Sequence, residues 1–160
     1  MTDWKTLLFN LNGRIGQNDF WKGVLVIIGA NLLLSFIPLI GGLIWLGLIY
    51  VGFCVYGKRL HDAGRSAVLH IIPWVIRLIV GAIVGMVMGG TLLSIILGNG
   101  DVDPWALASA GGAVMLLGLL DTFVWVAYTL WVGLAQGDTG ENAYGSAPVI
   151  EGEAKPVDPA

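Results

Sequence analysis

Long uncharged stretches separated by short polar segments dominate this sequence. Residues 23–57 carry no charged side chain; residues 66–100 carry only His70 and Arg77, and residues 104–137 carry only Asp121. A helix needs about 20 apolar residues to cross the hydrocarbon core of a bilayer. The pattern therefore predicts an all-α protein, a polytopic bundle of transmembrane helices.

Breaks in the apolar pattern divide these stretches into four expected spans. Pro38 and the Gly41-Gly42 pair fall in the middle of the first stretch, and proline there removes a backbone donor and clashes with the preceding turn. A single kinked helix is the alternative for residues 23–57. Residues 66–75 either lie at the membrane interface or belong to the third span. The expected spans lie near residues 20–37, 40–57, 76–98 and 105–134.

The positions of basic residues orient the expected spans. Loops rich in Lys and Arg stay in the cytoplasm. Such residues lie before the first span and after the second, whereas the loop after the third span has none. An even number of crossings must separate the two basic segments, which favours two helices in residues 23–57. We expect four spans with both termini in the cytoplasm. The basic residues are Lys5, Arg14, Lys22, Lys58, Arg59 and Arg65.

Composition supports a membrane location. The chain is 56% hydrophobic and 12% charged, whereas a soluble domain carries about a quarter charged residues. With eight basic residues and a net charge of −3, the chain has no nucleic-acid footprint. We expect the lipid bilayer as a partner and no nucleic acid. Residues 1–148 form the predicted membrane-embedded domain, and residues 149–160, rich in proline and acids, form a predicted disordered tail.

Three polar segments resemble a known family. Gly13-Arg14 followed by Phe20-Trp21, the segment Lys58–Ser66, and the turn Gly137–Pro148 are similar to the signatures of the YhaH-like bacterial inner-membrane proteins, domain of unknown function 805. Lys58 stands where that family has arginine. The resemblance covers residues 9–148 and implies a helical protein of the bacterial inner (plasma) membrane. It implies no reaction, because the family has no established activity.

The same segments supply a candidate cytoplasmic cluster. Its basic residues either hold the segment inside by contacting anionic lipid headgroups, at about 1 kcal/mol each, or form a binding patch. We also expect the Asp138 and Glu141 carboxylates to pair with the guanidinium groups of Arg59 and Arg65. The cluster comprises Gly13, Arg14, Arg59, His61, Asp62, Arg65, Asp138, Glu141, Asn142 and Tyr144.

Arg77 and Asp121 form a candidate pair inside the membrane. Arg77 lies 22 residues before Asn99 and Asp121 lies 17 residues after Pro104, which places them about 33 Å and about 26 Å from the outer loop at 1.5 Å per residue. Intramembrane charges usually pair or line a pathway. The alternative is that Arg77 reaches the headgroups while Asp121 meets cytoplasmic water.

Glycines on the third span suggest helix packing. Gly81, Gly85 and Gly89 recur every four residues, and such small residues let another helix approach closely. The ridge predicts packing against the second or fourth span, or, as the alternative, a homo-oligomer.

The sequence predicts no reaction. His61-Asp62 is too small a ligand set for a metal, and we expect no metal, cofactor or catalytic residue. The favoured hypothesis is a non-enzymatic accessory or scaffold component. A small oligomeric transporter or channel is the alternative, and an enzyme that acts on lipid headgroups through His61 and Asp62 is a third possibility.

Overall fold

The structure, a computed structural model, describes residues 3–34, 37, 40–98, 100–101 and 103–148. Within these ranges the chain is helical apart from connecting segments, with one isolated β-bridge and no strand. It divides into two compact units. The first unit comprises Met1–His70 with Trp131–Ala160, and the hairpin unit comprises Ile71–Leu130. The predicted disordered tail, 149–160, and Pro38 lie outside the described residues.

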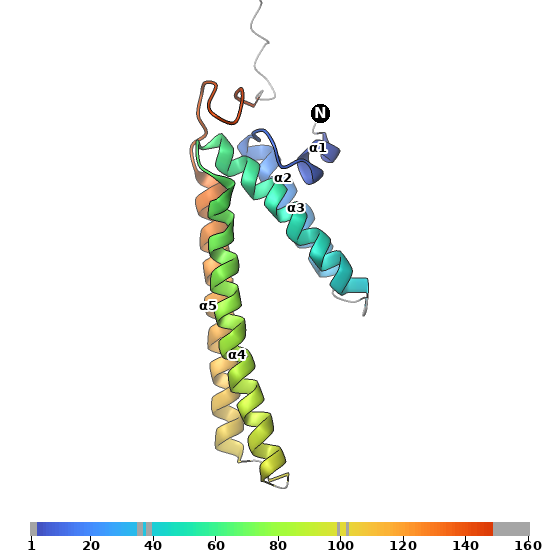
Figure 1. Cartoon of the computed structure of the whole chain (residues 1–160), viewed down its shortest axis with the longest axis vertical. Coiled ribbons are helices and arrows are strands. Elements are labelled where there is room, and N and C mark those ends of the chain that lie inside the picture. The colour runs from blue at the N-terminus through green and yellow to red at the C-terminus, as the bar shows by residue number, and fades with distance from the viewer. Residues whose placement is uncertain (1–2, 35–36, 38–39, 99, 102, 149–160) are drawn as a thin grey trace, which may run out of the picture. The chain divides into compact units, whose positions relative to one another are not determined.

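The described residues up to His70 in the first unit form α-helices, labelled in Figure 1, and a short 3-10 turn. They are α1 (Trp4–Phe9), α2 (Gln17–Leu34), α3 (Ile40–Asp62) and η1 (Ala67–His70). The start of α2 lies beside the end of α3: the ring of Phe20 meets that of Tyr56 edge-on, with centroids 5.1 Å apart. The two helices therefore run antiparallel, as two helices and not one kinked helix.

Aromatic rings pack among aliphatic side chains in the core of the first unit. Phe20 is fully buried, and His70 stacks on Tyr56 with ring centroids 4.6 Å apart. Gly23 allows α2 to approach α3 closely, since a Cβ at this position would overlap the Val55 side chain. This contact fixes the start of α2 against the last turns of α3, where the polar residues begin.

The hairpin unit consists of two long antiparallel helices, α4 (Ile71–Leu97) and α5 (Pro104–Leu134). The last turn of α5 belongs to the first unit. Pro104 is the first residue of its helix, where a missing N–H costs nothing. Trp74 and Trp125 meet edge-on at 5.2 Å and join the two helices.

Two helices in the described part of the chain are long and apolar enough to cross a membrane. They are Ala67–Leu97, which joins η1 to α4, and Pro104–Leu134. Their outward side chains are mostly apolar: Leu78 is 72% exposed and Phe123 is 69% exposed. An apolar surface of this extent is typical of a protein solvated by lipid.

Two helix boundaries correct the prediction. The segment after the second span was expected to be a loop, but α3 continues through Asp62. The chain turns out of the helix at Gly64, two residues past its end, where φ is +65, and the Arg65 N–H donates to the Leu60 carbonyl at 2.8 Å. This is the usual glycine-dependent helix stop. Helix α4, which contains the third expected span, starts at Ile71 and not near residue 76, so residues 71–75 belong to it.

Candidate functional site

Arg14 lies at the centre of a buried polar site in the first unit. Its Nε and Nη2 donate to Asp62 Oδ1 at 3.1 and 3.0 Å, and its side chain is 1% exposed. Nη1 donates to the carbonyl oxygens of Gly140 at 2.6 Å and Gly145 at 3.1 Å, and Nη2 also donates to that of Asp138. The planar guanidinium thus joins the start of α2, the end of α3 and the chain that follows α5.

Arg59 supplies a second guanidinium to the same carboxylate. Its Nη1 forms an ion pair with Asp62 Oδ2, and its Nη2 donates to the Ala135 carbonyl oxygen. Burial lowers the pKa of Arg59, while the Asp62 carboxylate opposes that shift. Two cations therefore share one anion, and backbone carbonyl dipoles supply the remaining negative potential. Removing any member leaves a buried charge without compensation.

The residues that follow α5, 135–148, form a strap held by backbone groups. The Asp138 N–H donates to the Asp62 carbonyl at 2.8 Å. Asn142 Nδ2 donates to the His61 carbonyl at 3.0 Å and to Asp138 Oδ2 at 2.8 Å. Asn142 and Gly145 exchange two backbone hydrogen bonds, and Gly145 takes φ +119, a conformation that favours glycine. The strap is thus a tight turn lying on the end of α3.

His61 and Tyr144 close the site from one side. Their rings stack with centroids 3.9 Å apart and planes 5° apart. His61 Nδ1 lies 3.2 Å from the Gly13 carbonyl oxygen, so it carries the proton and donates. Gly13 has φ +93, which presents that carbonyl at the turn before α2. Tyr144 therefore fastens the strap onto the histidine by ring contact.

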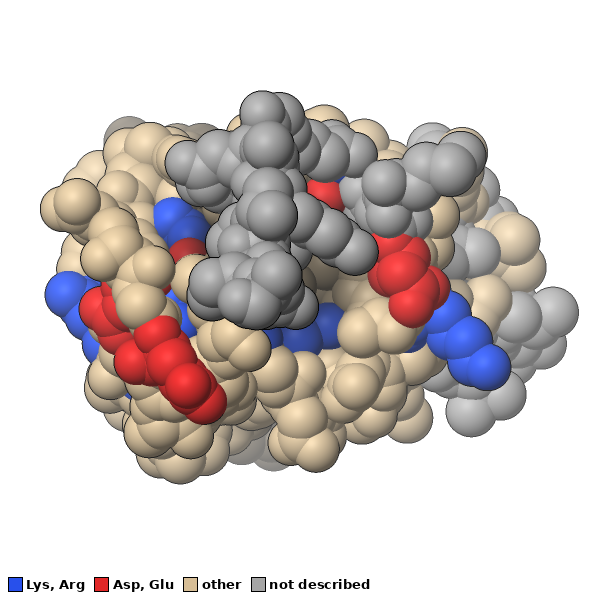
Figure 2. All heavy atoms as spheres, turned by 90° about the horizontal axis from the view of Figure 1, so that it is seen from above, with Lys and Arg blue, Asp and Glu red and all other residues tan. Residues whose placement is uncertain are grey.

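The structure brings most of the predicted cluster together, and we call this group the polar clasp. Seen from above, basic and acidic side chains lie next to one another at the surface (Figure 2), whereas the side chains of Arg14, Arg59 and Asp62 are buried. Arg65 forms no ion pair with a described acidic residue, and its guanidinium lies 4.5 Å from the centre of the Trp131 ring. The clasp comprises Gly13, Arg14, Arg59, His61, Asp62, Asp138, Asn142 and Tyr144.

The expected pairing of strap carboxylates with guanidinium groups is wrong in detail. The Asp138 carboxylate accepts from Asn142, and Glu141 is exposed with no ion pair to any described residue. The guanidinium groups of Arg14 and Arg59 bind the Asp62 carboxylate and strap carbonyls instead. The tight turn of the strap aims its backbone oxygens, and not its acidic side chains, at the arginines.

Sequence reasoning missed the helix α1 and the role of Lys58. Lys58 is 1% exposed, and its Nζ donates to the carbonyls of Thr6 and Leu7, the latter at 2.8 Å. Burial lowers the pKa of this ammonium group. A signal existed, because aspartate is a preferred residue just before a helix, and the Asp3 carboxylate accepts from the Lys5 and Thr6 N–H groups. Hydrogen bonds from Thr6 lower the pKa of Asp3.

Within the hairpin unit, the structure brings Arg77 and Asp121 together. Arg77 Nη2 and Nε donate to Asp121 Oδ2 at 2.6 and 3.1 Å. The guanidinium also lies 5.1 Å from the centre of the Trp125 ring. The Arg77 side chain stays 44% exposed, whereas that of Asp121 is 14% exposed. The pair thus joins α4 to α5 and leaves the cation on an otherwise apolar surface.

The predicted glycine ridge faces outward in the hairpin unit. Gly81, Gly85 and Gly89 are exposed, and a Cβ at each would meet no heavy atom of the described residues within 4 Å. Packing between α4 and α5 therefore does not use this ridge.

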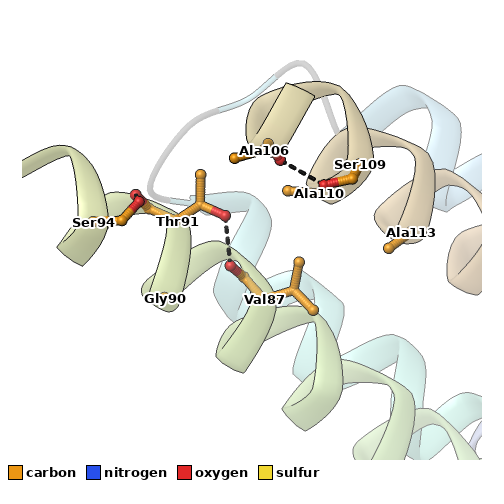
Figure 3. Close-up of a pocket in the computed structure, with 8 residues that line it drawn as sticks. All are labelled: Val87, Gly90, Thr91, Ser94, Ala106, Ser109, Ala110 and Ala113. Carbon is orange, nitrogen blue, oxygen red and sulfur yellow. Dashed lines mark hydrogen bonds between the residues drawn. The ribbon is translucent and has the colours of Figure 1, made fainter. Parts of the chain in front are cut away.

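A shallow groove of about 500 Å³ lies between α4 and α5 (Figure 3). Its hydroxyl groups are occupied by their own helices. Thr91 donates to the Val87 carbonyl at 2.9 Å, and Ser109 donates to that of Ala106 at 2.9 Å. Alanine and glycine form most of the remaining wall. The groove therefore presents an apolar surface of small side chains.

Comparisons with known proteins give this chain no relative. A scan against protein-family models, a search of the curated proteins and a search of the solved structures each found no match. The resemblance of the three polar segments to YhaH-like proteins therefore stays a prediction.

Proposed function

We propose that this chain is a four-span protein of the bacterial inner membrane, with both termini in the cytoplasm, that acts as a non-enzymatic accessory or scaffold component. One observation carries the proposal. The polar residues that could have formed a reactive or substrate site are bonded to one another, with Asp62 held between two buried guanidinium groups. These bonds hold segments of the chain to one another, and they leave Arg14, Arg59 and Asp62 paired with groups of the chain itself.

The state of His61 and Asp62 argues against an enzyme that acts on lipid headgroups. A general base needs a free lone pair within hydrogen-bond reach of its substrate. Both oxygens of the Asp62 carboxylate already accept from arginine, and the His61 ring is covered by Tyr144. A scaffold role requires neither group to react.

The arrangement of the first unit supports four spans. The turn before α2, the end of α3 and the strap after α5 meet in the polar clasp. A chain that leaves this site through α2 and returns through α3 makes two crossings, and α4 and α5 supply two more. Basic residues at the same end favour the cytoplasmic side.

Reporter fusions test this topology. A periplasm-active phosphatase fused after residue 100 should be active, and the same enzyme fused to the C-terminus should be inactive. A cytoplasm-active fluorescent reporter should give the opposite pattern. An active phosphatase at the C-terminus would contradict the proposal, because the strap and the basic end of α3 would then face outward.

The non-enzymatic role has its own test. Purified protein is incubated in vesicles of bacterial lipid extract, and the lipids are compared by mass spectrometry with vesicles that hold the His61→Gln variant. We expect identical lipid profiles. A headgroup change that requires His61 would overturn the proposal.

A small oligomeric transporter or channel is the second candidate. The outward glycine ridge and the partly exposed Arg77 favour it, because a second copy of the hairpin could cover both. Val84→Cys in a Cys54→Ala background should then crosslink between copies in vesicles, with solute flux that is lost in Arg77→Gln. Absence of both crosslink and flux would leave the scaffold role.

A further inference from the structure

Helix α1 is attached to α3 through its backbone. Lys58 Nζ donates to the carbonyl oxygens of Thr6 and Leu7, and the Tyr50 hydroxyl donates to the Phe9 carbonyl at 3.0 Å. Leu7 is the buried side chain of this helix, at 3% exposed. These contacts fix which face of α1 turns away from α3.

Two large aromatic side chains of α1 and one apolar side chain past its end are exposed, beside the polar Thr6. Trp4 is 48% exposed, Phe9 is 59% exposed and Leu11, just past the helix, is 46% exposed. Lys5 is exposed beside them. Tryptophan and other amphipathic side chains concentrate at membrane–water interfaces, where lysine also meets anionic headgroups. This composition fits a lipid boundary better than water.

The contacts with α3 also give the level at which α1 lies. Lys58 is 4 residues and Tyr50 is 12 residues before Asp62, the residue of α3 in the polar clasp. These separations correspond to about 6 Å and about 18 Å along the helix axis. Helix α1 therefore lies beside α3 on the apolar side of the clasp, and Tyr50, itself exposed, continues the same surface.

We infer that α1 is a membrane-surface helix that inserts Trp4, Phe9 and Leu11 into the cytoplasmic leaflet, at the boundary between headgroups and acyl chains. The inference rests on the proposed function, because it takes α3 as a span. It also moves the expected headgroup contact away from the basic segment, since the side chains of Lys58 and Arg59 are buried and bonded to the chain. Lys5 is the cation that meets anionic lipid.

Spin-label accessibility tests the inference in the full-length protein. Nitroxide labels are placed on Trp4→Cys and Phe9→Cys in a Cys54→Ala background, reconstituted in phosphatidylethanolamine–phosphatidylglycerol vesicles. Leu116→Cys, on the apolar hairpin, and Glu141→Cys, on the strap, are the controls; both native side chains are exposed. Relaxation by oxygen reports lipid, and relaxation by a water-soluble nickel chelate reports water.

The expected result is that labels at positions 4 and 9 prefer oxygen, as Leu116→Cys does, while Glu141→Cys prefers nickel. Labels at 4 and 9 that prefer nickel, beside a Leu116 label that prefers oxygen, would overturn the inference and leave the proposed function intact. Nickel accessibility at Leu116 as well would defeat both. As a second measurement, Lys5→Gln should shift the label at position 9 toward water in anionic vesicles and not in zwitterionic ones; an equal shift in both would contradict the role of Lys5.

Discussion

Arg14 and Asp62 form a buried ion pair in which Nε and Nη2 of the guanidinium donate to the same carboxylate oxygen at 3.1 and 3.0 Å. The same guanidinium binds three carbonyl oxygens of the strap, and the same carboxylate binds Arg59. This pair of residues, far apart in the sequence, therefore links the strap to α3, together with bonds from Arg59 and Asn142.

Substitution of Arg14 should release the strap. Arg14→Gln removes the fork that binds Asp62 and the strap carbonyls, and loss of one partner of a buried pair costs roughly 3–5 kcal/mol. We expect a lower melting temperature in detergent and faster proteolysis after residue 135. Arg14→Lys keeps the charge but not the planar fork. Its melting temperature should therefore lie between those of the wild type and Arg14→Gln.

A double-mutant cycle separates this arrangement from simple charge pairing. Arg14→Gln and Asp62→Asn should be strongly non-additive, because both remove the same buried contact. Arg65→Gln and Glu141→Gln should be additive, since Glu141 is exposed and forms no ion pair with a described residue. Coupling between Arg65 and Glu141 as large as that of the first pair would contradict the clasp.

Glycine at position 137 should be required by the clasp. A Cβ there would lie well inside van der Waals contact of the Asp62 carboxylate, which two guanidinium groups hold in place. We expect Gly137→Ala to lower the free energy of unfolding by about 1–3 kcal/mol, the usual range for overpacking. Gly140→Ala is the matched control in the same strap, because its Cβ would meet no described atom within 4 Å. Equal effects of the two substitutions would show that the strap can shift away from Asp62.

The sequence identified the members of the clasp better than their contacts. Three polar segments predicted a shared site, and a count of residues along two helices placed Arg77 and Asp121 in the same half of the membrane, with pairing as one of two alternatives. The structure brings both groups together. Periodicity and charge could give this much because they depend on side-chain type.

The bonds that fasten the strap had no such signal. Arg14 and Arg59 bind carbonyl oxygens of Asp138, Gly140 and Ala135, and every residue carries a carbonyl whatever its side chain. Only the backbone path of a tight turn aims those oxygens at the arginines. Helix α1 was missed because its six residues are too few to show a helical period.

The buried ammonium of Lys58 predicts a pH dependence of stability. Burial lowers the pKa of Lys58 in the folded protein from the usual 10.5. Between the lowered pKa and 10.5, the unfolded chain therefore binds more protons at this side chain than the folded protein does. The free energy of unfolding should therefore rise with pH from the lowered pKa up to about pH 10.5. Lys58→Met should lack this rise.

The exposed Lys5→Met variant is the control for Lys58. Tyr50 and Cys54 lie on the same face of α3 and also titrate in alkali, so the quantity to compare is the difference between each variant and wild type at every pH, by thermal unfolding in detergent. A Lys58→Met profile parallel to wild type would show that the ammonium group has no altered pKa.

Arg77 and Asp121 should stabilise the hairpin as a pair and not singly. A pair exposed to water contributes about 0–1 kcal/mol, but a single charge left among acyl chains costs roughly 2.5–3.5 kcal/mol. Asp121→Asn and Arg77→Gln should therefore each lower the melting temperature in lipid nanodiscs, and the double variant should recover part of the loss because no unpaired charge remains. Thermal unfolding of the four proteins measures this. Unchanged melting temperatures in both single variants would mean that Arg77 reaches water or headgroups by itself. Its 2.6 Å contact with Asp121 would then contribute nothing to the stability of the hairpin.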